Sequence, residues 1–271
     1  GATGAGAVGV KTCADPPTLR DIEVPVRGLP PALDGFTIAQ LTDIHVGPII
    51  GAPFTRQLVE RVNALDVDLV AITGDLVDGS VARLRDHVAP LGGLKSRHGT
   101  YFVTGNHEYY SGADAWIAEL RRLGITVLRN ERITVEHDGA PLDVLGVDDW
   151  RSKGFGGDHG HDLQKAAHGR DPTRPSLLLA HQPKVIDEAA SLGLNVVLCG
   201  HTHGGQMWPF GSIVVAMVQP YVVGLHQHAP DTWIYVHPGT GYWGPPMRLK
   251  VRAEIARITL RAVLEPDQGQ A

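Results

Sequence analysis

Apolar residues follow two different rhythms along this chain of 271 residues. Short runs of adjacent β-prone residues are typical of buried strands, whereas apolar residues that recur every three or four positions predict amphipathic helices. The expected strands span residues 36–41, 69–72, 101–103, 177–179 and 196–198, and the expected helices span residues 53–65, 81–91, 113–123 and 183–192. Strands that alternate with helices in this way predict an α/β fold.

Closely spaced strands replace this alternation in two parts of the sequence. They are expected over residues 126–128, 132–136 and 142–147, and again over residues 233–236 and 254–260. Together, the alternating and strand-rich parts predict a four-layer sandwich, in which two stacked mixed β-sheets are flanked by helices. The long, polar and glycine-rich segment 151–175 is expected to form a mobile rim loop.

Polar blocks directly follow five of the predicted strands. They are Asp43-Ile-His45, Gly74-Asp75, Gly105-Asn-His-Glu108, His181 and Gly200-His-Thr-His203. The carboxyl ends of neighbouring strands in an α/β sheet converge on one crevice, where such folds hold their chemistry. Seven side chains of these blocks can serve as metal ligands: Asp43, His45, Asp75, Asn106, His181, His201 and His203.

The number and type of these ligands predict two divalent ions. Seven donors are too many for one ion that must also hold water and substrate. Mixed oxygen and imidazole ligands favour Mn, Zn or Fe over Mg or Ca. Only Asp43 and Asp75 are anionic among them, so two bound ions leave the site about two charges positive. Such a site attracts anions, and paired metals stabilise both oxygens of a displacement at phosphorus, which predicts phosphoester hydrolysis.

Each block taken singly has a simpler interpretation. Asp43 alone is more typical of a turn or helix cap, and His181 alone of a surface histidine. Elsewhere the simpler interpretation is preferred: His159, His161, His226 and His228 are expected to be solvated, and His87, His98, His137 and His168 to lie on the surface. Asp148 and Asp149 follow a predicted strand, where substrate contact and an ordinary turn are both consistent with the sequence.

The same blocks carry a family resemblance. Asp-x-His, Gly-Asp-x-x-Asp, Gly-Asn-His-Glu, a lone His near Pro, and Gly-His-x-His resemble the calcineurin-like metallophosphoesterase superfamily over about residues 35–262. The strings at residues 41–47, 200–206 and 239–248 are similar to a bacterial branch, whose members often carry an upstream membrane anchor or export signal. The resemblance also implies the four-layer sandwich.

The resemblance assigns roles to individual residues. It implies that one metal is held by Asp43, His45, Asp75 and His203, and that Asp75 bridges to a second metal held by Asn106, His181 and His201. In an extended segment, alternate side chains point to opposite sides, which agrees with His201 and His203 serving different ions. His107 would protonate the leaving oxygen as the general acid, or stabilise charge in the transition state, and Asp78 would orient it.

A phosphodiesterase that uses a hydroxide bridging the two metals is the expected activity. Protein phosphatases of the superfamily have an arginine that clamps a phosphate monoester at the position of Gly79, and its absence here tilts the choice towards a phosphodiester or a pyrophosphate. The alternative is a pyrophosphatase acting on a nucleotide-linked lipid such as UDP-2,3-diacylglucosamine. It requires an apolar surface, for which the candidates are Trp208, Phe210, Tyr221 and Trp243. A minor alternative is a non-catalytic interaction module that binds metal.

Composition indicates one catalytic domain, expected over residues 21–271. Residues 1–20 are expected to be a tail: the remnant of a signal or anchor, or an artificial chain start. Membrane association through a missing upstream segment, outside the cytoplasm, is therefore expected, with a cytoplasmic location as the alternative. A net charge of −5 and a pI near 6.3 disfavour nucleic acid as an obligate partner. We expect a monomer with a small-molecule phosphoester substrate, and no disulfide between Cys13 and Cys199.

Overall fold

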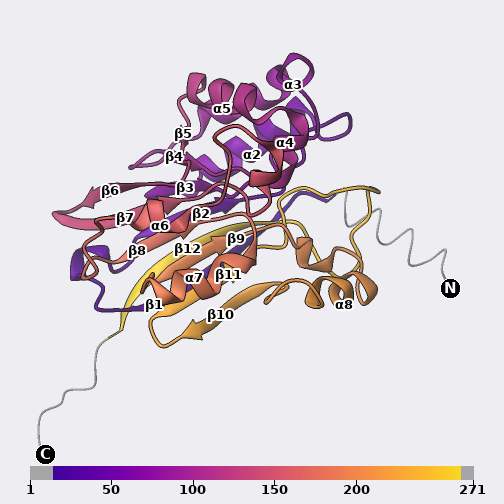
Figure 1. Cartoon of the computed structure of the whole chain (residues 1–271). Coiled ribbons are helices and arrows are strands. Elements are labelled where there is room, and N and C mark those ends of the chain that lie inside the picture. Colours follow the sequence, from indigo (N-terminus) through magenta and orange to yellow (C-terminus); the bar gives the residue numbers. More distant parts are fainter. Residues whose placement is uncertain (1–14, 264–271) are drawn as a thin grey trace, which may run out of the picture.

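Two six-stranded sheets form the centre of the molecule (Figure 1). The computed structural model describes residues 15–263. The first sheet has the order β1 (Thr18–Arg27), β12 (Glu254–Val263), β2 (Thr37–Leu41), β3 (Leu69–Ile72), β4 (Thr100–Phe102) and β5 (Thr126–Val127). The second has the order β10 (Gly224–Ala229), β11 (Thr232–Val236), β9 (Val196–Cys199), β8 (Ser176–Leu179), β7 (Ala140–Gly146) and β6 (Glu131–His137). Each sheet contains parallel and antiparallel pairs, so both are mixed.

Three apolar cores separate the layers. One core lies between the sheets, because alternate strand residues such as Ile38, Leu69 and Leu177 point towards the opposite sheet. The residues in between, such as Ala39 and Val70, pack against helices on the outer face of the first sheet. A third core lies between the second sheet and its own helices. The predicted four-layer sandwich is thereby confirmed.

Helices cover the outer faces of both sheets. The first sheet carries α2 (Ala52–Asn63), α3 (Val81–Val88), α4 (Asn106–Ser111) and α5 (Ala113–Arg122), and the second carries α6 (Leu163–Ala167) and α7 (Ile186–Ser191). In Figure 1, α8 (Phe210–Ala216) lies apart at one end of the molecule. Short 3₁₀ turns occur at η1 (Pro31–Leu33), η2 (Ala89–Gly93), η3 (Ser152–Phe155), η4 (Pro183–Val185) and η5 (His203–Gly205).

Most expected elements are present, with shifted ends. The expected helices 81–91 and 183–192 each divide into an α-helical and a 3₁₀ part. The sequence did not predict β1, whose first three residues belong to the expected tail, nor β10 and α8. Cys13 lies outside the described residues, while Cys199 is buried as a free thiol.

The strand register brings the polar blocks to one level. Leu41, Ile72 and Phe102 are cross-strand partners at the carboxyl ends of β2, β3 and β4, and Leu179 and Leu198 are partners on β8 and β9. The blocks that follow these strands therefore leave the two sheets at the same edge of the sandwich. The site is built from both sheets.

Candidate metal centre

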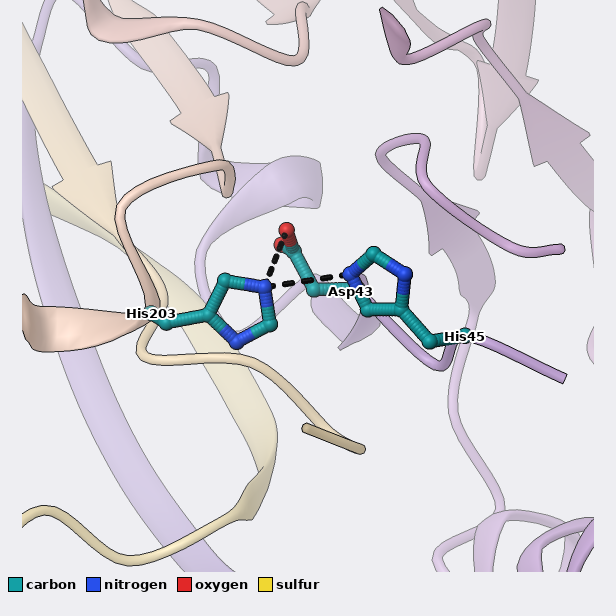
Figure 2. Close-up of side chains that lie close together, drawn as sticks. All are labelled: Asp43, His45 and His203. Carbon is teal, nitrogen blue, oxygen red and sulfur yellow. Dashed lines mark hydrogen bonds and ion pairs between the residues drawn. The ribbon is translucent and has the colours of Figure 1, made fainter. Parts of the chain in front are cut away.

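One group of candidate ligands consists of Asp43, His45 and His203 (Figure 2). His203 Nε2 lies 3.2 Å from Asp43 Oδ1 and 3.1 Å from His45 Nε2. All three side chains are buried. Two imidazole nitrogens and a carboxylate oxygen that face one point make a typical donor set for a transition metal.

A second group consists of Asp75, His181 and His201. His181 Nε2 lies 3.1 Å from Asp75 Oδ2 and 3.2 Å from His201 Nδ1. The same Asp75 oxygen is 4.0 Å from His45 Nε2, which belongs to the first group. Asp75 therefore lies between the two groups, where a bridging carboxylate would stand.

Asn106 provides a test of whether the residues fit metal. Its Oδ1 is buried and has no hydrogen-bond partner in the described part of the chain. A buried amide oxygen without a partner is costly, and a cation beside it removes that cost. Together with the two ligand groups, this orphan oxygen fits a site for two divalent ions.

Backbone strain is concentrated at the same residues. Five candidate ligands have left-handed backbone conformations, with φ between 50° and 71°: Asp43, His45, Asp75, His201 and His203. Each such non-glycine residue costs about 1–3 kcal/mol, and strain of this kind clusters at functional sites. The fold therefore holds these donors in place against a local preference, as a preorganised site requires.

Hydrogen bonds from outside the groups fix the histidine rings. His45 Nδ1 donates to Asp78 Oδ1 over 2.9 Å, and His181 Nδ1 donates to the carbonyl of Thr73 over 2.8 Å. Each contact leaves Nε2 with its lone pair directed into the site, the usual arrangement behind metal-binding histidines. Asp78 accepts a second bond, 2.7 Å long, from His107 Nδ1. One carboxylate thus holds both a candidate ligand and the predicted general acid.

Glu108 ties together two of the loops that carry ligands. Its Oε2 accepts the backbone N–H groups of Asp75 and Gly105, over 2.9 and 2.6 Å, and its Oε1 accepts that of Leu76 over 2.8 Å. A Cβ at Gly105 would overlap the Asp75 carboxylate, so only glycine allows this approach. This role of Glu108 was not predicted from the sequence, although a glutamate three residues after the start of a helix often reaches back in this way.

Arg248 is a second supporting residue that was not predicted from the sequence. It is fully buried, and its guanidinium donates to the carbonyls of Pro238 and Gly241. Its Nη2 is also 3.3 Å from His203 Nδ1. In turn, Gly241 N–H donates to the Asp43 carbonyl over 3.0 Å. Arg248 therefore holds the loop that supports Asp43 and adds positive charge behind His203.

Electrostatic interactions keep the two central carboxylates ionised. Burial alone would raise the pKa of Asp75, but His181 and His45 lower it to about 2. Burial likewise opposes ionisation of Asp43, and His203 nevertheless holds its pKa well below the usual range. Burial and the neighbouring His181 lower the pKa of His201 to about 3, which keeps this imidazole neutral. Ionised carboxylates and a neutral imidazole are the forms that bind metal.

His107 belongs to neither of these two groups, but it forms a third cluster of possible metal ligands with His45 and Asp78. Its Nε2 is 4.0 Å from Asp75 Oδ2. Burial lowers the pKa of His107, but the hydrogen bond to Asp78 and the charge of Asp75 raise it above the ordinary value. The predicted proton donor is thus placed over the centre with its Nδ1 anchored.

Several sequence-based expectations about this region were wrong. His201 and His203 do fall in different groups, but a turn with left-handed residues separates them, and the segment is not extended. His137 is buried and 3.0 Å from His98, so it is no surface residue. The supposedly solvated histidines also have partners: Arg129 for His159, Glu188 for His161, Tyr221 for His226 and Asp187 for His228.

The segment 151–175 packs partly into the fold. Its helix α6 places Leu163 and Ala166 in the third core. Its other end reaches the site, because the Phe155 ring lies 5.5 Å from that of Tyr110, which is itself 5.3 Å from His107. The neighbouring Asp148 is buried in an ion pair with Arg129, and Asp149 is buried beside Gln182. Both carboxylates are thus held by side chains within the fold.

Comparison with known proteins places the chain in a family. Residues 36–205 match the model of the calcineurin-like phosphoesterases. The chain belongs to the calcineurin-like phosphoesterase family. The metallophosphoesterase prediction is confirmed at this level, and divalent metal ions are the family's cofactors.

Relatives occur in animals and bacteria, so the resemblance is not confined to a bacterial branch. The chain is 44% identical over 266 residues to a bovine protein named "Transmembrane protein with metallophosphoesterase domain", and this covers 94% of the chain and 60% of that protein. It is 43% identical over 224 residues to an uncharacterized metallophosphoesterase of Helicobacter pylori, and this covers 82% of the chain and 59% of that protein. The chain thus spans about six tenths of these relatives.

Solved structures share the fold. A dimetal phosphatase from Danio rerio is 14% identical, with a TM-score of 0.52 over 83% of the chain and 99% of that protein. A phosphopantetheinyl hydrolase from Mycobacterium tuberculosis is 12% identical, with a TM-score of 0.51 over 88% of the chain and 99% of that protein. Within residues 15–263, none of the helices has the length and apolar character needed to cross a membrane.

Proposed function

We propose that the chain hydrolyses phosphodiesters with two divalent transition-metal ions, Mn, Zn or Fe. Asp43, His45 and His203 would hold one ion, and His181, His201 and Asn106 the other, with Asp75 shared. The observation that carries this proposal is the position of Asp75 between the two ligand groups. When bound, such ions neutralise phosphate charge and lower the pKa of a water molecule.

The chain's own residues supply proton transfer and orientation. Asp78 accepts the Nδ1–H of His107, so the proton available for transfer is the one on Nε2, which faces the centre. Asp78 and Asp75 raise the pKa of His107 against the effect of burial, which favours the protonated form of the ring. His107 would therefore protonate the leaving oxygen of the ester.

The surroundings of Gly79 support a diester. Its carbonyl accepts the Nε1–H of Trp116 over 2.8 Å, and a Cβ at this position would lie 3.1 Å from Leu84. The position is packed against apolar side chains of α3 and α5, where the phosphatase arginine has no counterpart. Arg248, close to the ligands, donates to backbone carbonyls behind His203. Without a clamp on a second phosphate charge, a diester is the better-matched substrate.

The test compares bis(p-nitrophenyl) phosphate with p-nitrophenyl phosphate, with Mn, Zn, Fe and Mg supplied in turn. We expect faster turnover of the diester, dependent on a transition metal. Asp75→Asn should abolish turnover, whereas the matched control Asp86→Asn, which changes an exposed aspartate of α3, should retain it. Preference for the monoester would contradict the proposed substrate class. Absence of any turnover with all four metals would favour the non-catalytic interaction module.

A pyrophosphatase acting on a nucleotide-linked lipid is the second candidate. Trp243 is 55% exposed and its ring lies 6.1 Å from that of His107, so an apolar surface does adjoin the centre. Trp208 and Phe210 are also exposed, whereas Tyr221 packs partly against the third core. Release of UMP from UDP-2,3-diacylglucosamine, at a higher kcat/KM than for the diester, would favour this candidate over the first.

Membrane association and a monomeric state belong to the same proposal. The bovine and zebrafish relatives are both named as transmembrane proteins with a metallophosphoesterase domain. For this chain, we propose a catalytic domain that works at a membrane surface outside the cytoplasm, as a monomer with a small-molecule substrate. Fractionation of cells that express the full-length protein, with protease protection to define the side, tests the location.

A further inference from the structure

Helix α8 differs from the other helices in the direction of its apolar residues. Phe210, Ile213 and Val214 of the helix, with Met217 and Val218 directly after it, recur at the spacing of one helical face. Such a face is normally turned to the core, but these five side chains are between 58% and 79% exposed. No residue of α8 is buried.

The helix is attached to the metal centre through its small residues. Ser212 Oγ donates to the Gly204 carbonyl over 3.2 Å, and Gly211 N–H donates to the Met207 carbonyl over 2.9 Å. A Cβ at Gly211 would overlap the Gly205 carbonyl, so the close approach requires glycine. Because the small side faces the turn that carries His203, the apolar side must face away from the protein.

The exposed apolar surface continues to the mouth of the site. Gln206 exchanges hydrogen bonds with the backbone of Trp243, which stands beside His107. Met207 and Trp208, between Gln206 and α8, are 41% and 47% exposed. Figure 1 shows α8 at the same end of the molecule as the segment that precedes β12. We call the exposed residues Met207, Trp208, Phe210, Ile213, Val214, Met217 and Val218 the α8 face.

The charge around this face matches a lipid surface. Residues 204–229 contain no Asp, Glu, Lys or Arg. At the margin, Leu249 pairs with Met207, and the exposed Lys250 places its ammonium 4.0 Å from the Trp208 ring centroid. Arg252 is exposed two residues later. An uncharged apolar stripe with a tryptophan and bordering cations is the pattern of helices that lie in the interface of an anionic bilayer.

We propose that the α8 face inserts into the headgroup region of a phospholipid bilayer and presents the metal centre to phosphoesters in that membrane. The substrate part of this inference rests on the proposed function, whereas the docking of the α8 face to a membrane does not. Phe210, Ile213 and Met217 would enter the apolar boundary, while Lys250 and Arg252 contact lipid phosphates. The substrate class would then be a phosphoester of a membrane lipid.

The test is sedimentation of the metal-loaded chain with vesicles of phosphatidylcholine, with and without phosphatidylglycerol. The double variant Ile213→Ser, Met217→Ser should lower partitioning onto vesicles by about tenfold or more, because each large apolar side chain contributes substantially on burial. The double variant Leu19→Ser, Val263→Ser is the matched control. It removes two side chains that are 44% and 41% exposed on β1 and β12, and should partition like the original chain.

Lys250→Gln separates the electrostatic from the apolar contribution. It should lower partitioning about fivefold on vesicles with phosphatidylglycerol, and have little effect on pure phosphatidylcholine. Equal partitioning of the α8 variant and the original chain would overturn the proposal. The proposal would also be overturned if the original chain formed a dimer and did not bind vesicles, while the α8 variant was a monomer. The α8 face would then join two copies of the chain.

Turnover distinguishes this inference from the proposed function. Ile213 and Met217 are not candidate ligands, so their double variant should still hydrolyse bis(p-nitrophenyl) phosphate in solution. Vesicle binding without hydrolysis of any ester would refute the proposed function alone. Hydrolysis in solution without vesicle binding would refute the docking alone.

Discussion

Replacement of His107 by alanine separates its proposed role in proton transfer from metal binding. His107 belongs to neither the group of Asp43 nor the group of Asp75, although it clusters with His45 and Asp78, and Asp78 holds its ring at 2.7 Å. His107→Ala should therefore retain both metals and the fold. It should slow hydrolysis most strongly when the leaving oxygen is basic and needs a proton.

The structure supports a loss in the middle of the usual range. A positioned general acid contributes about 10²- to 10⁴-fold. His107 is anchored at Nδ1, the Asp78 hydrogen bond and the Asp75 charge raise its pKa above the ordinary value against the effect of burial, and its Nε2 is 4.0 Å from Asp75 Oδ2. We therefore expect a loss of about 10³-fold in kcat for an alkyl leaving group. For a p-nitrophenyl group, which departs as a stable anion, the loss should be about tenfold or less.

The assay measures kcat on two methyl phosphodiesters that differ only in the second alcohol, p-nitrophenol or ethanol, together with bound metal. His168→Ala, which changes an exposed histidine, is the matched control and should hydrolyse both esters at the original rates. Equal losses on both esters with metals retained would refute the assignment, and would indicate that His107 binds substrate or stabilises charge.

Three further predictions concern the centre and its supports. Asp75→Asn should bind fewer than half as many ions as the original chain, because the ligand shared by both groups is weakened. Mass spectrometry measures the bound metal. Metal affinity should fall as the pH decreases, by about tenfold per pH unit for each proton that the metal displaces. Asp75 and Asp43 hold the pKa of His181 above its usual value against the effect of burial, so the metal must displace a proton from this ring. Calorimetry in two buffers measures the proton release. Arg248→Leu should lower the free energy of unfolding by about 3 kcal/mol in denaturant titrations, because the carbonyls of Pro238 and Gly241 lose their donor.

The sequence predicted the buried strands well because their apolar runs have a single structural interpretation. The expected strand 69–72 matches β3, and 177–179 falls within β8. By contrast, β1 alternates buried Val24 and Val26 with residues that are exposed or half-buried, and Asp21 and Glu23 pair with arginines of β12. Such a strand is recognised only once its partner is known. Helix α8 was not predicted because it has only seven residues, and so short an apolar segment is not distinguished from a strand or a loop by its spacing.

The clustering of the candidate ligands was predictable because each block follows the end of a strand, but the residues that support them were not predictable. Glu108 acts through backbone N–H groups, whose position depends on two loops brought together by the fold. Arg248 reaches the centre from a segment far along the chain. The surface expectation for His137 failed because a histidine has no fixed preference for burial, and its neighbour His98 comes from a different part of the sequence.

Titration of the metal-free chain with Mn²⁺ tests the central claim, a phosphodiesterase with two metals, most directly. Bound metal and turnover of bis(p-nitrophenyl) phosphate are measured on the same samples. Because Asp75 joins the two ligand groups, turnover should rise until two ions are bound per chain and then remain constant. Full turnover with one ion bound, or turnover that does not depend on metal, would contradict the account.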